Sequence, residues 1–300
     1  MNSSTKGVLF AVFAYALWGI LPVYWHILDF AGPLQILGCR INFALGFTAL
    51  VLGITGNRTW LRLITGKETR FYTIGAGLVI SFNWGLYIWA VNTGHTIDAS
   101  LGYYINPLVA IFLGLVFLKE KLSVLQWSAF GMAFVGVILL AFFSGIFPWI
   151  ALLLAASFGL YGLFKKKNGG GALESLGAET LAAFPIGLAL LLFPPSEFSK
   201  ALSFSPFQWV LLASAGIVTA IPLLTFARGA KLLPLSTVGF LQFINPTILF
   251  FLGIFAFGES FPLKNLWAFG FIWAAVILYC VSLWTKRNGR EEAPGVRADS

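Results

Sequence analysis

The sequence predicts an all-α integral membrane protein, with ten transmembrane helices arranged as two inverted five-helix repeats around a central cavity. Three observations carry this prediction: the composition, the length of the apolar segments and a repeat within the chain. Of the 300 residues, 59% are hydrophobic and only 10% are charged, and the mean hydropathy is +0.88. A water-soluble domain needs about 25% charged residues to cover its surface. The chain therefore requires lipid around it.

Ten apolar segments have the length of about 20 residues that a helix needs to cross the hydrocarbon core of a bilayer. We expect them at residues 7–27, 34–54, 72–91, 99–118, 124–143, 146–164, 176–193, 207–227, 235–257 and 266–284. The loops between these spans are too short to hold a soluble domain. Residues 286–300 are polar and charged, and this composition predicts a disordered tail.

The lysine and arginine positions predict the orientation of the spans. With the N-terminus in the cytoplasm, all but three of the 19 Lys and Arg residues fall on the cytoplasmic side, as the positive-inside rule requires. The exceptions are Lys200 and Lys264 outside and Arg40 within a span. Both termini, and the tail, are then cytoplasmic in a multi-pass plasma-membrane protein. The basic pI of about 9.6 reports this topology, so a nucleic-acid partner is not expected.

A repeat relates the two halves of the chain. The stretch INPLVAIFLGLVFLKEKL begins at Ile105, and INPTILFFLGIFAFGESF begins at Ile244. The same spacing that relates these two isoleucines also relates Glu120 to Glu259. We therefore expect two five-helix units, residues 1–144 and 145–285. Because five is odd, the second unit enters the membrane in the opposite orientation, and the lysines beside Glu120 are accordingly missing beside Glu259.

Inverted repeats are typical of secondary transporters, whose substrate site lies near the bilayer midplane where the repeats meet. The sequence therefore predicts a carrier that moves a small organic metabolite or drug by alternating access. A passive channel stays an alternative, because some channels are also inverted duplications. An intramembrane lipid-modifying enzyme would need a clustered nucleophile, base or metal set. The sequence offers none, so neither an enzyme nor a cofactor or metal site is expected.

The repeat motifs resemble the drug/metabolite transporter superfamily, in its EamA-domain family. The stretches AYALWGILPVYW, SFNWGLYIWAVNTGHTIDASLGYYINPL and LQFINPTILF are similar to RarD-type permeases, the chloramphenicol-sensitivity proteins. The resemblance covers residues 7–284. It implies two EamA-like repeats in the bacterial inner membrane, with both termini in the cytoplasm. It also implies a cavity lined mainly by spans one, three, four, six, eight and nine.

Two Asn-Pro pairs are candidate hinges on the cavity wall. They are Asn106-Pro107 and Asn245-Pro246. Proline removes one backbone hydrogen bond from a membrane helix, and an adjacent Asn can satisfy the freed group or bind a ligand. A packing kink without ligand contact is the alternative for both pairs.

Further aromatic and amide side chains on the same spans are candidates for contact with the substrate. They are Trp18, Asn83, Tyr87, Tyr103, Tyr161, Phe240 and Gln242. Aromatic faces and amides suit an amino-acid-like, aromatic or amphipathic solute. Since 17% of the chain is aromatic, many rings must face lipid, and this is the alternative for any one of them.

Three ionisable residues are candidates for gating or coupling. Arg40, inside span two, would recognise an anion or act in gating; alternatively it snorkels or pairs structurally, as its position on a less central helix favours. Glu179, its counterpart in the repeat, would couple protons to transport, or would be an interfacial acid at a helix start, which we favour. His95, near Asp98 in an outer loop, would sense protons, although an ordinary loop role is the favoured interpretation.

The expected partners are a small-molecule substrate and the lipid bilayer, with protons as the candidate coupling ion. Small residues on spans five and ten, among them Gly131 and Gly270, suit either helix packing or a homodimer contact.

Overall fold

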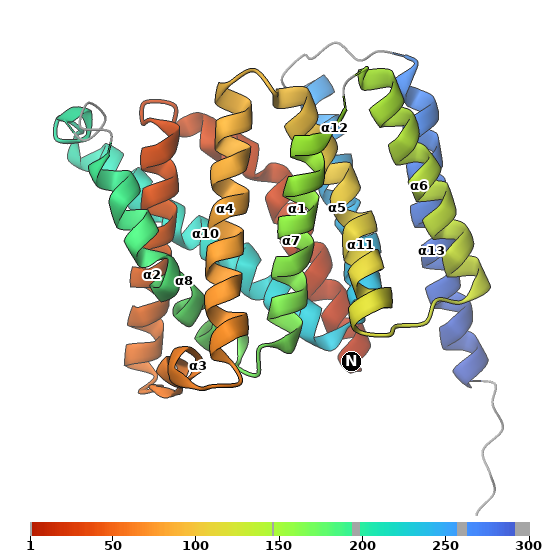
Figure 1. Ribbon diagram of the computed structural model, residues 1–300, viewed down its shortest axis with the longest axis horizontal. Helices are drawn as coiled ribbons and strands as arrows, with labels where there is room; N and C mark the ends of the chain where they lie inside the picture. The colour runs from red at the N-terminus through yellow and green to blue at the C-terminus, as the bar shows by residue number, and fades with distance from the viewer. Residues whose placement is uncertain (1, 146, 194–198, 257–262, 292–300) are drawn as a thin grey trace, which may run out of the picture. The chain divides into compact units, whose positions relative to one another are not determined.

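The computed structural model describes residues 2–145, 147–193, 199–256 and 263–291. Within these ranges the ordered elements are helices and no strand is present (Figure 1). They are α1 (Ser3–Ile27), α2 (Pro33–Ile54), η1 (Thr59–Leu61), α3 (Arg62–Thr65), α4 (Arg70–Asn92), α5 (Thr96–Phe117), α6 (Val124–Ser144), α7 (Trp149–Lys167), α8 (Ala172–Leu192), α10 (Pro206–Leu232), α11 (Leu235–Gln242), α12 (Ile244–Phe255) and α13 (Asn265–Glu291).

The described residues contain 10 helical segments long and apolar enough to cross a membrane, which confirms the ten predicted spans. The ninth span differs from the expected continuous helix, because it consists of α11 and α12, which meet at Phe243. Helix α13 continues to Glu291, into the segment where a disordered tail was expected. Residues 292–300 and Glu259 lie outside the described residues.

Polar caps explain where several helices begin. The Asn2 side chain accepts a hydrogen bond from the Thr5 backbone N–H at 2.8 Å. Ser123 before α6 and Ser205 before α10 each form a capping box with a Gln three residues later. Such reciprocal bonds satisfy N–H groups that a helix start leaves without partners.

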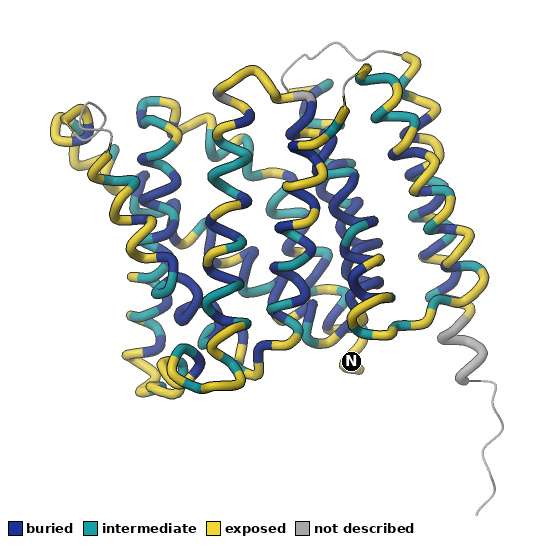
Figure 2. The backbone as a smooth tube through the Cα atoms, viewed as in Figure 1, coloured by how far each residue is buried: buried dark blue, intermediate teal, exposed yellow. Residues whose placement is uncertain are grey.

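By its contacts the chain divides into two units. The first unit consists of Met1–Lys119 and Pro148–Ser260, and it contains all the spans except α6 and α13. Its buried residues lie along the facing sides of neighbouring helices (Figure 2). The second unit contains α6 and α13, which pack against each other.

Within the first unit, helices of the two predicted halves interleave. Helix α2 contacts α8 and α10, α4 contacts α7 and α8, α1 contacts α10 and α12, and α5 contacts α7 and α11. In the predicted repeat, α1 corresponds to α7, α4 to α10, and α5 to the span made of α11 and α12. If each helix is replaced by its counterpart, the α1–α10 contact becomes the α4–α7 contact, and the α5–α7 contact becomes the α1–α12 contact. Two equivalent halves would produce this correspondence. The inversion of the second half stays a prediction.

Glycines allow two of these interhelical contacts to become very close. A Cβ atom on Gly77 of α4 would lie 2.5 Å from the Glu179 backbone oxygen in α8, and one on Gly216 of α10 would lie 2.3 Å from the Phe43 carbonyl carbon in α2. Backbones at this distance leave no space for a side chain. The α4–α8 and α2–α10 contacts are therefore fixed by glycine.

In the second unit, Ala129 and Ala133 on α6 are fully buried. A Cβ on Gly136 would lie 2.8 Å from the Ala268 carbonyl oxygen of α13. Gly131 and Gly270 differ, because a Cβ on either residue would meet nothing within 4 Å. These two glycines do not form the contact between α6 and α13, and the homodimer stays a prediction.

Candidate functional site

A cavity of about 440 Å³ lies within the first unit. Its walls come from both predicted halves: α1, α2, α4 and α5 from the first, and α7, α10, α11 and α12 from the second. His26, at the end of α1, and Pro33, at the start of α2, border the cavity and are exposed. The cavity therefore opens at the end of the unit where the α1–α2 loop lies, and its volume is in the range of small-molecule sites.

Arg40 is the only Lys, Arg, Asp or Glu residue among the described residues that line the cavity. Its guanidinium carbon lies 4.5 Å from the ring centroid of Trp25 and 4.4 Å from that of Trp84. Its Nε atom donates a hydrogen bond to Thr219 Oγ1 at 3.1 Å. Among the described residues it forms no ion pair. The cavity thus holds a positive charge that no carboxylate of the described chain compensates.

This placement corrects our preference for a snorkelling or structurally paired Arg40, and it adds span two to the expected lining. Helix α2 packs between α8 and α10, so this side chain is half-buried inside the protein. The lining implied by the family resemblance did not name span two, and hydropathy does not show which way a side chain within a span faces.

Three amides on the cavity wall are incompletely satisfied. Asn106, Gln242 and Asn245 border the cavity and are 5%, 3% and 6% exposed. The side-chain oxygen of each is buried without a hydrogen-bond partner among the described residues. A buried acceptor without a partner costs about 1–3 kcal/mol, so these atoms are suited to a donor that the chain does not supply.

The other predicted cavity residues divide into two groups. Trp18, Asn83, Tyr87 and Tyr103 line the cavity, and the rings of Tyr87 and Tyr103 lie 5.6 Å apart, edge to face. The Asn83 amide donates to the Leu154 carbonyl and to Ser157 Oγ, both at 2.9 Å, and so joins α4 to α7. The second group, Phe240, Pro107, Pro246 and Tyr161, is buried but does not line the cavity.

The two Asn-Pro pairs have different backbones. Helix α5 continues through Pro107, whereas α11 ends at Gln242 and α12 begins at Ile244, two residues before Pro246. The Tyr104 hydroxyl donates to the Pro246 carbonyl at 3.2 Å. Hydrogen bonding therefore links the two proline regions, although only the second interrupts its helix.

An aromatic cluster bounds the cavity on the side away from its opening. Trp18 lies 5.7 Å from Phe158 and 5.5 Å from Phe226, measured between ring centroids. Phe226 stacks on Tyr161 at 5.8 Å, and its edge meets Tyr15 at 6.1 Å. Tyr161, which we expected in the cavity, is fully buried in this cluster, behind the lining residues Trp18 and Phe158.

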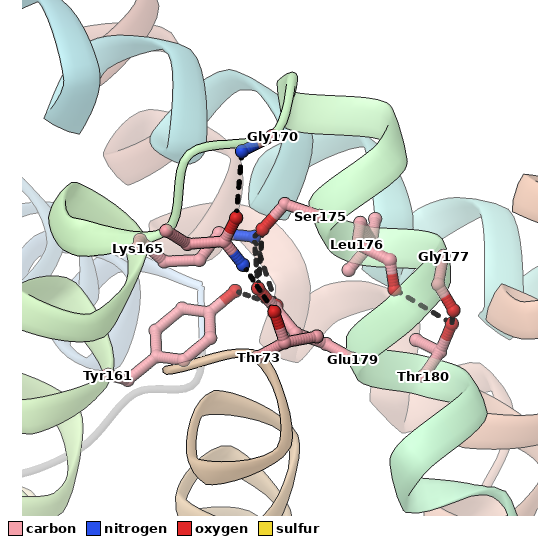
Figure 3. Close-up of polar contacts among 10 residues, drawn as sticks. Thr73, Tyr161, Lys165, Gly170, Ser175, Leu176, Gly177, Glu179 and Thr180 are labelled. Carbon is pink, nitrogen blue, oxygen red and sulfur yellow. Dashed lines mark hydrogen bonds and ion pairs between the residues drawn. The ribbon is translucent and has the colours of Figure 1, made fainter. Parts of the chain in front are cut away.

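A buried ion pair between Lys165 and Glu179 lies next to Tyr161 of the aromatic cluster (Figure 3). Lys165 Nζ lies 2.8 Å and 2.9 Å from the two carboxylate oxygens of Glu179, and it donates to Ser175 Oγ at 2.9 Å. The Ser175 hydroxyl donates to Glu179 at 2.6 Å, and Tyr161 donates to it at 3.4 Å. The Lys165 and Glu179 side chains are 0% and 2% exposed. Glu179 therefore differs from the interfacial acid that we favoured, because α7 supplies a buried lysine opposite it.

Further polar bonds surround this ion pair at the same end of the unit. The Asn168 amide donates to Thr73 Oγ1 at 2.9 Å, and its oxygen accepts the Gly170 N–H at 2.9 Å. Lys166 Nζ donates to the backbone carbonyls of Ala230 and Leu233. These bonds join the ends of α4, α7 and α10.

His95 precedes α5 and Asp98 lies in its first turn, not in a loop as expected, and the two side chains do not pair with each other. His95 is exposed, stacks on Trp89 at 5.4 Å and lies outside the cavity lining. Asp98 is buried, and its carboxylate accepts hydrogen bonds from the Ile150 and Ala151 N–H groups at 3.3 Å and 3.1 Å. It thus caps the start of α7 from a neighbouring helix.

The described residues hold no group of three or more His, Cys, Asp or Glu residues that could bind a metal ion. The cavity, with its arginine, amides and aromatic rings, is the candidate functional site.

Comparison with known proteins identifies the family. Residues 5–142 match the EamA-like transporter family. The transporter YojE of Bacillus subtilis (strain 168) is 44% identical and covers 92% of this chain and 94% of its own. Protein RarD of Streptomyces exfoliatus is 42% identical, over 96% and 93%. A crystal structure that is 20% identical matches with a TM-score of 0.69 over 94% of this chain and 98% of the other, which is a likeness of fold.

The fold and the site agree with these relatives. The ten apolar helices place the chain in the inner membrane as a multi-pass protein, and the cavity supplies room for a small-molecule substrate. The chain therefore belongs to the EamA-like transporter family, among its RarD-type permeases, and is a membrane transporter.

Proposed function

We propose that the protein is a secondary-active permease that moves a small organic solute by alternating access. One observation carries this proposal: a cavity between the two predicted halves opens at one end, and an aromatic cluster and a buried ion pair lie between it and the other end. A carrier needs one binding site and a closed region that can alternate between the two sides of the membrane. An open pore would need a continuous path instead.

The positive-inside rule supports an orientation for this cavity. Three basic residues, Arg58, Arg62 and Lys67, lie between α2 and α4, and Arg70 is the first residue of α4. They lie at the end of the unit that also holds the α7–α8 turn. In our proposal this end faces the cytoplasm, so the described conformation is open to the outside. The N-terminus at Ser3 then also lies on the cytoplasmic side.

The ion pair also gives protons a way to act on transport. Protonation of Glu179 would remove the charge that Lys165 faces across 2.8 Å, and a buried lysine without its partner destabilises the structure around it. We propose that Glu179 belongs to the cytoplasmic closure and does not contact the substrate, because the aromatic cluster lies between it and the cavity. Its protonation would favour opening on that side.

Purified protein in proteoliposomes distinguishes a carrier from a channel. Radiolabelled phenylacetate, L-phenylalanine, phenethylamine and chloramphenicol are suitable probes, because they share a small aromatic body and differ in charge. We expect that uptake of at least one probe saturates and is accelerated by the same unlabelled compound inside the vesicle. Linear uptake without such counterflow would favour the channel.

Cysteine labelling tests the orientation separately. In a variant without Cys39 and Cys280, a membrane-impermeant maleimide should label His26→Cys from outside intact cells, whereas Arg62→Cys should react only after the cells are opened. The reverse pattern would contradict the proposed sidedness, while leaving the counterflow result unaffected.

A further inference from the structure

We propose that the transported solute carries a carboxylate, which binds the guanidinium of Arg40, and a hydrogen-bond donor, which the amides of α5, α11 and α12 accept. This inference rests on the proposed function and names its substrate class. An aromatic or otherwise apolar body joins the two polar groups.

The first support is the charge of the cavity. Arg40 is the only Lys, Arg, Asp or Glu among the described lining residues, and it has no carboxylate within ion-pair distance among them. A charge away from water is costly unless an opposite charge or several hydrogen bonds compensate it. The indole faces of Trp25 and Trp84 supply part of this compensation. An anionic ligand would supply the rest.

The second support is the geometry of the guanidinium. The two indoles cover it, and Thr219 accepts the Nε–H. The Nη groups make no hydrogen bond to another described residue, so they remain for a ligand. A planar pair of Nη–H groups matches the two oxygens of a carboxylate, and this bidentate geometry is the reason that arginine is preferred to lysine at such sites.

The third support is the set of unsatisfied acceptors that α5, α11 and α12 contribute to the cavity wall. Asn106 on α5, Gln242 on α11 and Asn245 on α12 each have a buried side-chain oxygen without a donor among the described residues. An ammonium, amide N–H or hydroxyl group would satisfy them. A halide or nitrate ion offers no such donor, and an organic cation would be repelled by Arg40. The observations therefore favour an amino-acid-like or hydroxy-acid-like monocarboxylate.

Between these polar groups the cavity surface is aromatic and aliphatic. Trp18, Tyr87, Tyr103 and Phe158 border it. Such surface stabilises a flat apolar body through its burial and through ring contacts. A volume of about 440 Å³ is sufficient for one aromatic ring with a short polar side chain.

Pairs of probes that differ only in the carboxylate test the inference on the unmodified protein. Phenylacetate is compared with phenylacetamide, L-phenylalanine with L-phenylalaninamide, and phenyl phosphate represents a non-planar anion. The measurement is the ligand-induced rise in melting temperature of the purified full-length protein, together with the dissociation constant from calorimetry. We expect the carboxylates to bind about 10- to 100-fold more tightly than their amides. Equal affinity within each pair, or preference for the phosphate, would overturn the proposal.

Variants then assign the effect to Arg40. Arg40→Gln should remove the preference for carboxylates over amides, and Arg40→Lys should retain only part of it, because lysine keeps the charge without the planar pair of donors. Arg228→Gln is the matched control. Arg228 is an exposed arginine over the Phe10 ring at 5.6 Å and does not line the cavity. A full carboxylate preference in Arg40→Gln would refute the assignment.

The binding assay keeps this inference separate from the proposed function. Carboxylate binding without counterflow in proteoliposomes would support the site and contradict the carrier. Counterflow of phenethylamine or of a neutral amide, unaffected by Arg40→Gln, would support the carrier and contradict the substrate class.

Discussion

The buried Lys165–Glu179 pair allows a quantitative test of the closure. The Lys165 ammonium has three hydrogen-bond acceptors: both oxygens of Glu179 and the hydroxyl of Ser175. In Lys165→Met, the Glu179 carboxylate keeps only the hydroxyls of Ser175 and Tyr161 as hydrogen-bond partners among the described residues. In Glu179→Gln, the lysine keeps neutral oxygens only. Since removal of one member of a buried pair typically costs about 3–5 kcal/mol, we expect each single variant to lose roughly this amount of unfolding free energy.

The double variant Lys165→Met/Glu179→Gln should be more stable than either single variant, because it buries no unpaired charge. We expect it to lie within about 2 kcal/mol of the original protein, which gives a coupling energy of at least about 4 kcal/mol between the two positions. Lys167→Met is the control. Lys167 is exposed, with Tyr72 at 5.9 Å, and its loss should change stability by less than about 1 kcal/mol.

Equilibrium unfolding in mixed detergent micelles, titrated with SDS and followed by tryptophan fluorescence, measures these differences. Additive single effects would show that the two charges do not stabilise each other. A loss below about 1 kcal/mol in Lys165→Met would show that the lysine is hydrated or neutral, and would refute the buried closure.

Three further predictions concern packing, capping and flux. Gly77→Ala should lower the unfolding free energy by about 1–3 kcal/mol, because its Cβ would meet the α8 backbone at 2.5 Å. The control Gly46→Ala, whose Cβ would meet nothing within 4 Å, should leave the unfolding free energy unchanged. SDS titration measures both variants. Asp98→Ala should cost about 1–2 kcal/mol in the same assay, since α7 loses its cap; an unchanged midpoint would contradict that role. Asn106→Ala should reduce proteoliposome flux more than Glu120→Ala, because Asn106 borders the cavity; equal effects at matched protein levels would count against it.

The membrane fold could be predicted from the sequence because hydropathy and segment length respond directly to the bilayer. The ten spans follow from those two quantities alone. The interruption at Phe243 could not be predicted in the same way, since α11 and α12 form one continuous apolar stretch. Pro246 marks the region, yet Pro107 occupies the corresponding position in α5 without ending the helix. The presence of a proline at this position therefore does not by itself interrupt the span.

The site was only partly predictable, because hydropathy does not report which way a side chain faces. Lys165 was counted among the basic residues that mark the cytoplasmic side, but it is fully buried opposite Glu179. The signal for this pair was the short turn between α7 and α8, which brings the end of α7 close to the start of α8. Tyr161 was placed in the cavity as one of the aromatic candidates, but the ring lies behind Phe158, within the aromatic cluster.

The uncompensated charge of Arg40 has an energetic consequence for a carrier in an energised membrane. With a hydroxy-acid-like monocarboxylate bound, which carries no ammonium, the site is electrically neutral; without it, the site carries one positive charge. An inside-negative voltage acts on the second form only, by up to about 2.3 kcal/mol per 100 mV if the charge experiences the whole field. Under the proposed cycle, the resting potential would thus draw the empty transporter toward the cytoplasm-facing state. The direction in which solute is released would follow from whether the empty or the loaded transporter has to move its charge through the field.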